Sequence, residues 1–264
     1  MMLARVLKAY VLRIPSGPVN PASGNGRRVR LMAVTMVRDE MRFLPGLLRN
    51  VGPQVDGVIA LDDGSTDGSL ELLESSPFVV ELLRNPSDRP RFDETGGHRR
   101  LVEAALRRGA EWIVAVDADE RMEREFRTRA ERVIRRGRRL GLKAFEVRIR
   151  DLWDSAGRYR ADGLWGRKWA PRLFRALPGH LFDERPLHAA KAPLQGKICG
   201  VFPLADLFFY HLRMVRPEDR EERRRRYERL DPDARFQSKV GYRYLTDERG
   251  IRLRPVPERR SYAD

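Results

Sequence analysis

The chain has 264 residues, of which 41% are hydrophobic, and this is enough for one large α/β domain or two small ones. Charged residues make up 34%, and 53 Lys and Arg against 38 Asp and Glu give a net charge of +15. The apolar runs are far shorter than the roughly 20 residues of a membrane span, which excludes a membrane-spanning protein. The single cysteine excludes a disulfide framework. We therefore expect a soluble, cytoplasmic protein with anionic partners, such as phosphorylated substrates, nucleic acid or an anionic membrane surface.

The first segment, residues 1–14, carries apolar residues at helical spacing, which predicts an amphipathic helix. Its basic residues Arg5, Lys8 and Arg13 interrupt the apolar pattern, which argues against a signal peptide. Such a helix either lies peripherally on the inner face of the membrane or packs against its own domain, and the sequence leaves both open. Residues 16–28 are rich in Gly, Pro and Ser and predict a linker.

From residue 29 onward, short apolar runs alternate with helical segments. We predict strands over 29–37, 57–61, 78–83 and 112–116. Helices are predicted over 41–51, with Asp39 as its N-cap, over 68–75 and over 97–109. This alternation implies an α/β fold with a Rossmann-like, mostly parallel sheet and helices on both faces. Nucleotides bind at the carboxyl ends of such strands.

The second half of the chain is less regular. We predict a very basic helix over 121–139, a strand with one solvent-exposed face over 143–150 and a further strand over 168–175. A highly charged surface helix is predicted over 217–230. The residues beyond Asp231 have no predicted place in the fold.

Acidic residues follow two of the predicted strands. Asp62 and Asp63 follow one strand, and Asp117 and Asp119 follow another. Because residues i and i+2 of an extended chain point the same way, Asp117 and Asp119 can share one side of the strand end. Two carboxylates there suit a hard divalent cation that a diphosphate can bridge. The alternative is that Asp117 caps the next helix and Asp119 lies in solvent.

The segment that begins at Asp62, after the predicted strand 57–61, has a rival interpretation as a calcium-binding EF-hand loop. The residue spacing of an EF-hand loop is matched by the potential ligands Asp63, Ser65, Asp67 and Glu74, and by Gly68 at the position of the loop glycine. An EF-hand needs a helix before the loop, whereas residues 57–61 form an apolar run typical of a buried strand. We therefore favour the strand-end interpretation.

Three segments, taken together, carry a family resemblance. They are Val34-Thr35-Met36-Val37-Arg38-Asp39-Glu40, Leu61-Asp62-Asp63-Gly64-Ser65-Thr66-Asp67-Gly68-Ser69 and Ala115-Val116-Asp117-Ala118-Asp119-Glu120. In this order and spacing they resemble the family 2 glycosyltransferases with the GT-A fold, over roughly residues 30–214. The resemblance implies a nucleotide-diphosphate sugar donor, a divalent metal (Mn²⁺ or Mg²⁺) and inversion at the anomeric carbon. The acceptor, whether a polysaccharide, a lipid-linked glycan or a small molecule, is not identified.

The resemblance also implies roles for residues that contact the nucleotide. Thr35 and Glu40 match the first loop, which holds the nucleobase and ribose, and Asp63 matches the acid that contacts the nucleoside. Arg99 matches a basic residue that approaches the nucleotide. Arg99 is equally consistent with an ordinary solvated residue on a helix.

The metal and diphosphate motif of the family is matched by Asp117 and Asp119. His211 is the candidate for a third metal ligand, because a histidine near the end of the catalytic domain completes the metal shell in some family members. A neutral imidazole suits Mn²⁺. The alternative is that His211 is a packed core residue after an apolar run.

The chain departs from the family at the catalytic base. An inverting transfer needs a carboxylate to accept the proton of the acceptor hydroxyl. In similar members a Glu often follows the histidine that matches His188, but here Ala189 follows. Glu184, and after it Asp183, are the nearest candidates for the base.

The predicted organisation has four parts. They are an amphipathic helix and linker (1–28), a nucleotide-sugar-binding half (29–120), a more irregular acceptor and catalytic half of the same domain (121–215), and a charged C-terminal helix and tail (216–264). One alternative is a non-catalytic GT-A module that binds a nucleotide or a partner, which Ala189 supports. Another is a nucleic-acid-binding protein, which the net charge supports but the glutamates interspersed among residues 220–229 disfavour.

Overall fold

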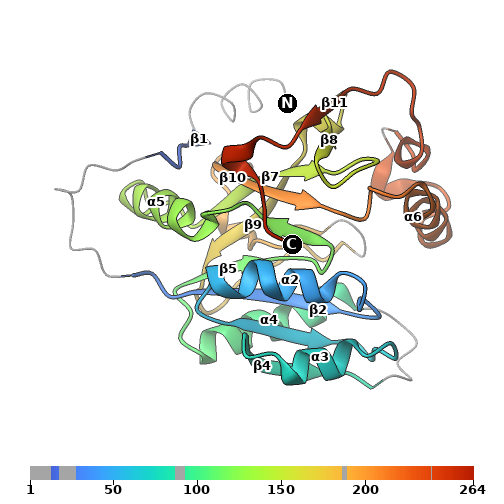
Figure 1. Ribbon diagram of the computed structural model, residues 1–264. Coiled ribbons are helices and arrows are strands. Elements are labelled where there is room, and N and C mark those ends of the chain that lie inside the picture. The colour runs from blue at the N-terminus through green and yellow to red at the C-terminus, as the bar shows by residue number, and fades with distance from the viewer. Residues whose placement is uncertain (1–12, 18–27, 87–92, 186–188, 239) are drawn as a thin grey trace.

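The structure is a computed structural model that describes residues 13–17, 28–86, 93–185, 189–238 and 240–264. A nine-stranded sheet runs through it (Figure 1). Its strands are β1 (Arg13–Ile14), β2 (Leu31–Val37), β3 (Val58–Asp62), β4 (Val79–Arg84), β5 (Trp112–Ala115), β6 (Glu120–Met122), β7 (Ala144–Asp151), β9 (Trp169–Arg175) and β10 (Leu204–His211). Their order is β1-β10-β7-β9-β5-β2-β3-β4, with β6 beside β10. A second, two-stranded sheet pairs β8 (Arg158–Arg160) with β11 (Leu253–Pro255).

Helices cover both faces of the large sheet. The helices are α2 (Leu44–Val51), α3 (Ser69–Ser75), α4 (Glu94–Arg107), α5 (Phe126–Arg139) and α6 (Pro217–Leu230). In β2, Leu31 and Ala33 belong to the core shared with α2, α3 and α5, whereas Met32 and Val34 belong to the core shared with α4. This alternation follows from the strand geometry, in which successive side chains point to opposite faces. The predicted α/β class is thus confirmed.

The strand directions bring several chain segments to one edge of the sheet. Strands β2, β3, β4 and β5 are mutually parallel, and β10 is parallel to β7. Strand β9 is antiparallel to both β5 and β7, so β7 and β10 run in the same direction as β5. The carboxyl ends of β2, β3, β5, β7 and β10 therefore meet at the same edge.

The segment predicted as an N-terminal helix, residues 1–14, ends in a strand. Residues 1–12 and 18–27 lie outside the described residues. Arg13 and Ile14 form strand β1 and pair with Leu204 and Ala205 of β10. The predicted helix over 1–14 is therefore wrong at its end, because the backbone of these two residues pairs with a sheet edge.

Asp39 does not cap the first helix. It has a φ of +53°, and its carboxylate accepts hydrogen bonds from the backbone N–H and the hydroxyl of Thr66, at 2.7 and 3.2 Å. Helix α2 begins only at Leu44, with Phe43 at the N-cap and a proline in its first turn. The predicted N-cap is wrong because the carboxylate links this loop to the one that follows β3.

Two further predictions in the second half need correction. The segment predicted as a helix from residue 121 begins as strand β6, and α5 starts at Phe126. Strand β7 has no solvent-exposed face, because Arg150 packs over Tyr159 with its guanidinium carbon 4.5 Å from the ring centre, and Arg148 packs over Trp169 at 4.6 Å. The long aliphatic stems of arginine allow it to occupy positions that the charge pattern predicts as exposed.

The C-terminal segment, for which the sequence predicts no place beyond α6, folds back onto the sheet (Figure 1). A separate apolar cluster joins Trp153 and Trp165 to Tyr242 and Leu245. Arg220 of α6 is buried and lies over Trp153 at 4.1 Å, so α6 is more than a solvated surface helix. In the part of the chain that the structure describes, every helix is too short or too polar to span a lipid bilayer.

Candidate active site

Two buried carboxylates, Asp62 and Asp63, lie where β3 ends and the next loop begins. Asp62 Oδ2 accepts hydrogen bonds from the backbone N–H groups of Gly64 and Ser65, each at 3.0 Å, which holds the turn. Asp63 is 1% exposed, and its Oδ1 accepts a hydrogen bond from Asn85 Nδ2 at 2.6 Å. Its Oδ2 lies 3.6 Å from Arg38 and has no hydrogen-bond partner among the described residues. This oxygen remains available to accept from a ligand.

The same loop lacks the features of an EF-hand. Strand β3 precedes it, where a calcium loop needs a helix. Glu74, at the twelfth position, forms an ion pair with Arg84 instead of facing Asp63. The structure therefore agrees with the strand-end interpretation.

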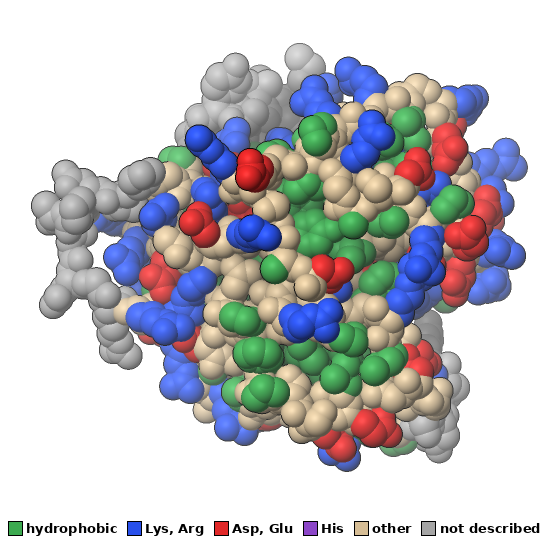
Figure 2. Space-filling view, in the orientation of Figure 1, with side chains coloured by type: hydrophobic (Ala, Val, Ile, Leu, Met, Phe, Trp, Pro, Cys, Tyr) green, Lys and Arg blue, Asp and Glu red, His purple; other side chains and the backbone are tan. Residues whose placement is uncertain are grey.

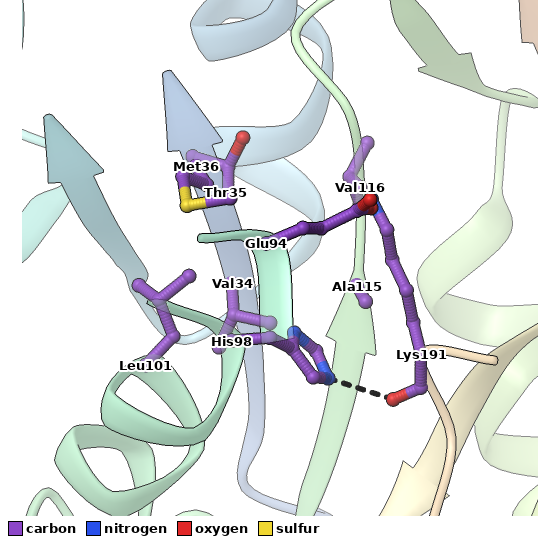
Figure 3. Close-up of a pocket in the computed structure, with 9 residues that line it drawn as sticks. All are labelled: Val34, Thr35, Met36, Glu94, His98, Leu101, Ala115, Val116 and Lys191. Carbon is purple, nitrogen blue, oxygen red and sulfur yellow. Dashed lines mark hydrogen bonds between the residues drawn. The ribbon is translucent and has the colours of Figure 1, made fainter. Parts of the chain in front are cut away.

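A small pocket lies beside β2, between α4 and the segment that carries Lys191 (Figure 3). Apolar side chains, among them Val34 and Ala115, form much of its wall. Thr35 also lines it, and its buried hydroxyl oxygen has no hydrogen-bond partner among the described residues. His98 lies below, with its Nε2 2.7 Å from the carbonyl oxygen of Lys191. The pocket thus combines an apolar wall with the charged residues Glu94 and Lys191.

His98 predicts a pH dependence of stability. Burial and the charge of Lys191 lower the pKa of His98 to about 4, from an ordinary value of 6.5. Between these pH values the unfolded chain binds a proton that the folded chain does not, so the contribution of neutral His98 is complete above about pH 6.5 and is lost as the pH falls toward 4. We expect this residue to reduce the free energy of unfolding by roughly 3 kcal/mol over that interval.

The measurement is urea unfolding at pH 7 and at pH 4.5, with His98→Gln as the comparison. Glutamine can still donate to the Lys191 carbonyl but does not titrate. The variant should lose less stability on acidification than the wild type. An equal loss in both proteins would show that His98 does not carry this dependence.

Asp117, after β5, is held by two cations. It accepts a hydrogen bond from Arg172 Nη2 at 2.7 Å and forms an ion pair with Lys191. Arg172 also donates to Glu120 Oε1 at 2.6 Å. Although desolvation alone raises the pKa of Asp117, these two cations hold it below its ordinary value. Asp117 is therefore ionised and already neutralised by its neighbours.

Asp119 points to a different set of partners. Its Oδ2 accepts a hydrogen bond from Arg213 Nε at 2.5 Å and lies 3.2 Å from His211 Nε2. The other end of Arg213 donates to the carboxylate of Glu40, so one guanidinium links the first loop to Asp119. Desolvation raises the pKa of Asp119, but His211 and Arg213 hold it well below its ordinary value. The described residues offer no hydrogen bond to Oδ1 of Asp119.

His211, the last residue of β10, is 4% exposed and uses both ring nitrogens. Nδ1 lies 2.6 Å from Asp151 Oδ1, and Nε2 lies 2.8 Å from Arg223 Nη1. Desolvation lowers the pKa of His211, but the charge of Asp119 and hydrogen bonds to Asp119 and Asp151 raise it above its ordinary value. A proton on Nε2 allows donation to Asp119, whereas without that proton Nε2 accepts from Arg223.

The structure brings together some predicted site residues and separates others. Asp119, His211 and Glu40 form one connected group, and Asp117 lies with Arg172 and Lys191. The two aspartates have different hydrogen-bond partners because β5 ends at Ala115 and the chain then turns, with the N–H of Glu120 donating to the carbonyl of Asp117 at 2.9 Å. They remain close enough for the charge of Asp119 to oppose the lowering of the pKa of Asp117. Across the described ranges, no three His, Cys, Asp or Glu side chains are grouped so that they could hold a metal ion by themselves.

Of the two candidates for the base, Glu184 lies on the surface and Asp183 is partly buried. Glu184 forms an ion pair with Arg99 at 2.6 Å, so the predicted nucleotide-binding arginine and the predicted base contact each other. The Glu184 side chain is 76% exposed. Asp183 pairs with Arg185 at 2.6 Å. His188 lies outside the described residues.

Several residues at this edge carry no distinctive sequence signal. Asp63 is held by Asn85, which is bonded in turn to Arg100. Asp117 is held by Arg172 and Lys191. Around Asp119 and His211 lie Arg213, Arg223 and Asp151. Arginine is so abundant in this chain that a single one does not stand out. Asp151 offers the one usable signal, since it is an acidic residue at the end of an apolar strand.

Comparisons with known proteins give distant similarities. No protein-family model matches the chain. Uncharacterized proteins of Mycobacterium tuberculosis and Mycobacterium bovis are 27% identical over 221 residues, which cover 81% of this chain and 54% of theirs. The chain thus spans about half the length of these curated relatives.

Solved structures similar to the chain include Staphylococcus aureus TarS (residues 1–349), with a TM-score of 0.46, 15% identity and coverage of 83% of this chain and 69% of that one. Another is glucosyl-3-phosphoglycerate synthase from Mycobacterium tuberculosis in complex with Mg²⁺ and uridine diphosphate, with a TM-score of 0.32, 17% identity and coverage of 47% and 44%.

Proposed function

We propose that the chain is a glycosyltransferase that moves a sugar from a nucleotide-diphosphate donor to an acceptor, with a divalent metal and inversion at the anomeric carbon. The observation that carries the proposal is the meeting of Asp63, Asp119, Glu40 and His211 at the carboxyl edge of one sheet. These four residues come from the ends of three strands, β2, β3 and β10, and from the turn after β5. Nucleotides bind at this edge in α/β proteins.

The nucleoside would lie toward β3 and the pocket beside β2. Oδ2 of Asp63, which lies 3.6 Å from Arg38 but makes no hydrogen bond to a described residue, can accept one from a base or ribose. The Thr35 hydroxyl, which also has no described hydrogen-bond partner, would supply a second polar contact. Asn85 and Arg100 hold Asp63 in place through a chain of hydrogen bonds. This assignment agrees with the family resemblance of the first two motifs.

The residues around Asp119 fit a divalent ion in part. A carboxylate and an imidazole are ligands that Mn²⁺ accepts, and Asp119 Oδ2 and His211 Nε2 face each other at 3.2 Å. Mg²⁺ and related ions are often held by one or two protein groups together with substrate phosphates, so a cluster of three protein ligands is not required. Asp119 and His211 would therefore hold the ion. When bound, it would stabilise the charge on the departing diphosphate.

The cationic side chains at this edge suit the same diphosphate. Arg172 and Lys191 on one side, and Arg213 and Arg223 on the other, flank the two aspartates. In the transfer, the acceptor oxygen forms a bond to the anomeric carbon while the bond from that carbon to the phosphate oxygen breaks, and the electron pair stays on the diphosphate. The proton of the acceptor hydroxyl passes to a carboxylate, for which we propose Glu184 and, second, Asp183.

Asp63 tests the nucleoside site separately from the metal. In a thermal-shift screen of nucleoside diphosphates with and without Mn²⁺, we expect at least one nucleotide to raise the Tm of the wild type, because a ligand that binds only the folded state stabilises it. Asp63→Ala should weaken the binding of that nucleotide, and so reduce the rise in Tm, even without metal, because the substitution removes the buried hydrogen-bond acceptor. Asp67→Ala, in the same loop but at an exposed residue that accepts hydrogen bonds from the backbone N–H groups of Met41 and Ser69, is the control. Equal shifts in wild type and Asp63→Ala would contradict the assignment.

The surface charge gives less support to nucleic acid as the partner. Figure 2 shows Lys and Arg side chains spread over the visible face, with Asp and Glu side chains among them. Many of these arginines are paired, for example Arg42 with Asp219 at 2.7 Å and Arg138 with Glu111 at 2.8 Å. A nucleic-acid surface concentrates unpaired basic residues on one face.

We also propose a cytoplasmic location with reversible attachment to an anionic membrane. The support is the net charge of +15 and the basic residues Arg5 and Lys8 of the N-terminal segment, since Arg13 pairs with Asp206 at 3.0 Å. Co-sedimentation with anionic liposomes should then decrease when the salt concentration rises. Absence of co-sedimentation at low salt would contradict this location.

A further inference from the structure

The structure assigns Asp151 as a positioning residue that keeps a proton on His211 Nδ1 and thereby directs Nε2 at Asp119. The metal-binding part of this inference rests on the proposed function. The proton position on the ring does not depend on it.

The backbone fixes the three residues relative to one another. Asp151 and His211 are the last residues of β7 and β10 and are direct partners in the parallel pairing of these strands. The N–H of Leu152 donates to the carbonyl of His211 at 3.0 Å, and the N–H of Leu212 donates to the carbonyl of Asp119 at 2.8 Å. Each residue therefore has a backbone hydrogen bond beside it that limits its movement.

The Asp151 side chain is held from two sides. It is 0% exposed, and its Oδ1 lies 2.6 Å from His211 Nδ1 and 2.8 Å from Lys168 Nζ. Its Oδ2 accepts a second hydrogen bond from Lys168 at 3.1 Å. A carboxylate that is ionised can only accept, so the hydrogen between Asp151 and the ring belongs to Nδ1.

The consequence appears at the other ring nitrogen. With Nδ1 protonated, the neutral ring has its lone pair on Nε2, and this atom lies 2.8 Å from Arg223 Nη1 and 3.2 Å from Asp119 Oδ2. In the neutral ring, which the alkaline limit isolates, this lone pair can accept a hydrogen bond from the Arg223 guanidinium. Histidines that bind a metal commonly donate their other N–H to a carboxylate, which sets the ring orientation and raises its basicity. Asp151 occupies that position here.

The first test is the position of the proton. Nitrogen-15 NMR of histidine-labelled protein distinguishes the two neutral tautomers, and His211→Gln identifies the signal among the 4 histidines. In the alkaline limit we expect the Nδ1–H form in the wild type and in Asp151→Asn, whose amide oxygen still accepts. Asp151→Ala should shift the ring toward the Nε2–H form. The Nε2–H form in the wild type, or an unchanged ring in Asp151→Ala, would overturn the inference.

The second test is metal affinity, measured by electron paramagnetic resonance with Mn²⁺ as the only ligand added. Loss of a group that orients a metal ligand weakens metal binding by about 10- to 100-fold, and we expect this for Asp151→Ala. Asp151→Asn should retain most of the affinity. Asp233→Ala, at an acid whose side chain is 67% exposed and pairs with Arg235, should bind Mn²⁺ as the wild type does.

The outcomes separate the inference from the proposed function. A wild type that binds no Mn²⁺ contradicts the proposed metal site, and the NMR result then decides the role of Asp151 by itself. If the wild type binds Mn²⁺ and Asp151→Ala binds it with the same affinity, the inference is contradicted and the proposed function is unaffected. If Asp151→Ala does not fold, the wild-type tautomer and the Asp151→Asn affinity remain decisive.

Discussion

Asp119→Ala should abolish the metal-dependent part of nucleoside diphosphate binding. Asp119 is one of the two groups proposed to hold the metal, and its Oδ2 is also bonded to Arg213 and faces His211. Removing a direct ligand should exceed the effect of removing an orienting group, so we expect a loss of more than about 100-fold in affinity in the presence of Mn²⁺. Isothermal titration calorimetry with and without Mn²⁺ measures it.

Two comparisons make this result specific. The metal-independent affinity should survive in Asp119→Ala, because Asp63 and its partners lie at a different strand end. Asp233→Ala, at an acid that is 67% exposed and pairs only with Arg235 among the described residues, should leave both affinities unchanged. Unchanged Mn²⁺-dependent affinity in Asp119→Ala would contradict the proposed metal site.

Trp153→Ala should be the most destabilising of the changes considered. Trp153 is 0% exposed, and the guanidinium carbons of Arg220 and Arg160 lie 4.1 and 4.5 Å from its ring centre. Truncation of a buried tryptophan costs about 3–5 kcal/mol, and the cation–π contacts are lost with it. Urea unfolding measures the change in the free energy of unfolding.

The effect of Trp153 should extend to the site through α6. Arg220 and Arg223 belong to the same helix, so loss of the contact at Trp153 loosens the helix that places Arg223 beside His211. Trp153→Phe keeps an aromatic face for both arginines and should be destabilised much less. Trp169→Ala, where the ring is only half-buried, is a control for the loss of an indole at a partly exposed position. A change below about 1 kcal/mol in Trp153→Ala would show that this cluster does not hold the C-terminal segment.

The sequence predicts the first half of the fold well because that half is regular. Apolar runs such as 57–61 and 112–116 fill strands buried on both faces, and their spacing leaves little choice of topology. Asp63 could be selected for the same reason, since it directly follows such a strand. The direct partners of Asp63 are harder to predict, because Asn85 approaches it only through the pairing of β3 with β4.

The second half was harder to predict because its interactions are between distant residues. The i, i+2 rule holds for an extended chain, and the turn at these residues gives Asp117 and Asp119 different ion-pair partners. Asp151 reaches His211 across 60 positions of sequence through strand pairing. Arg220 looks like a surface residue in a charged helix, but its stem and guanidinium pack against Trp153.

The central claim is that this sheet edge consumes a nucleotide-diphosphate sugar. The most direct measurement is the release of nucleoside diphosphate from a panel of nucleotide sugars, with Mn²⁺, by the wild type and by Asp119→Ala. Even without the natural acceptor, water can serve as a poor one, so we predict slow release from at least one donor. This release should require Mn²⁺ and be lost in Asp119→Ala. No release from any donor, together with no shift in Tm by any nucleoside diphosphate, would contradict the claim.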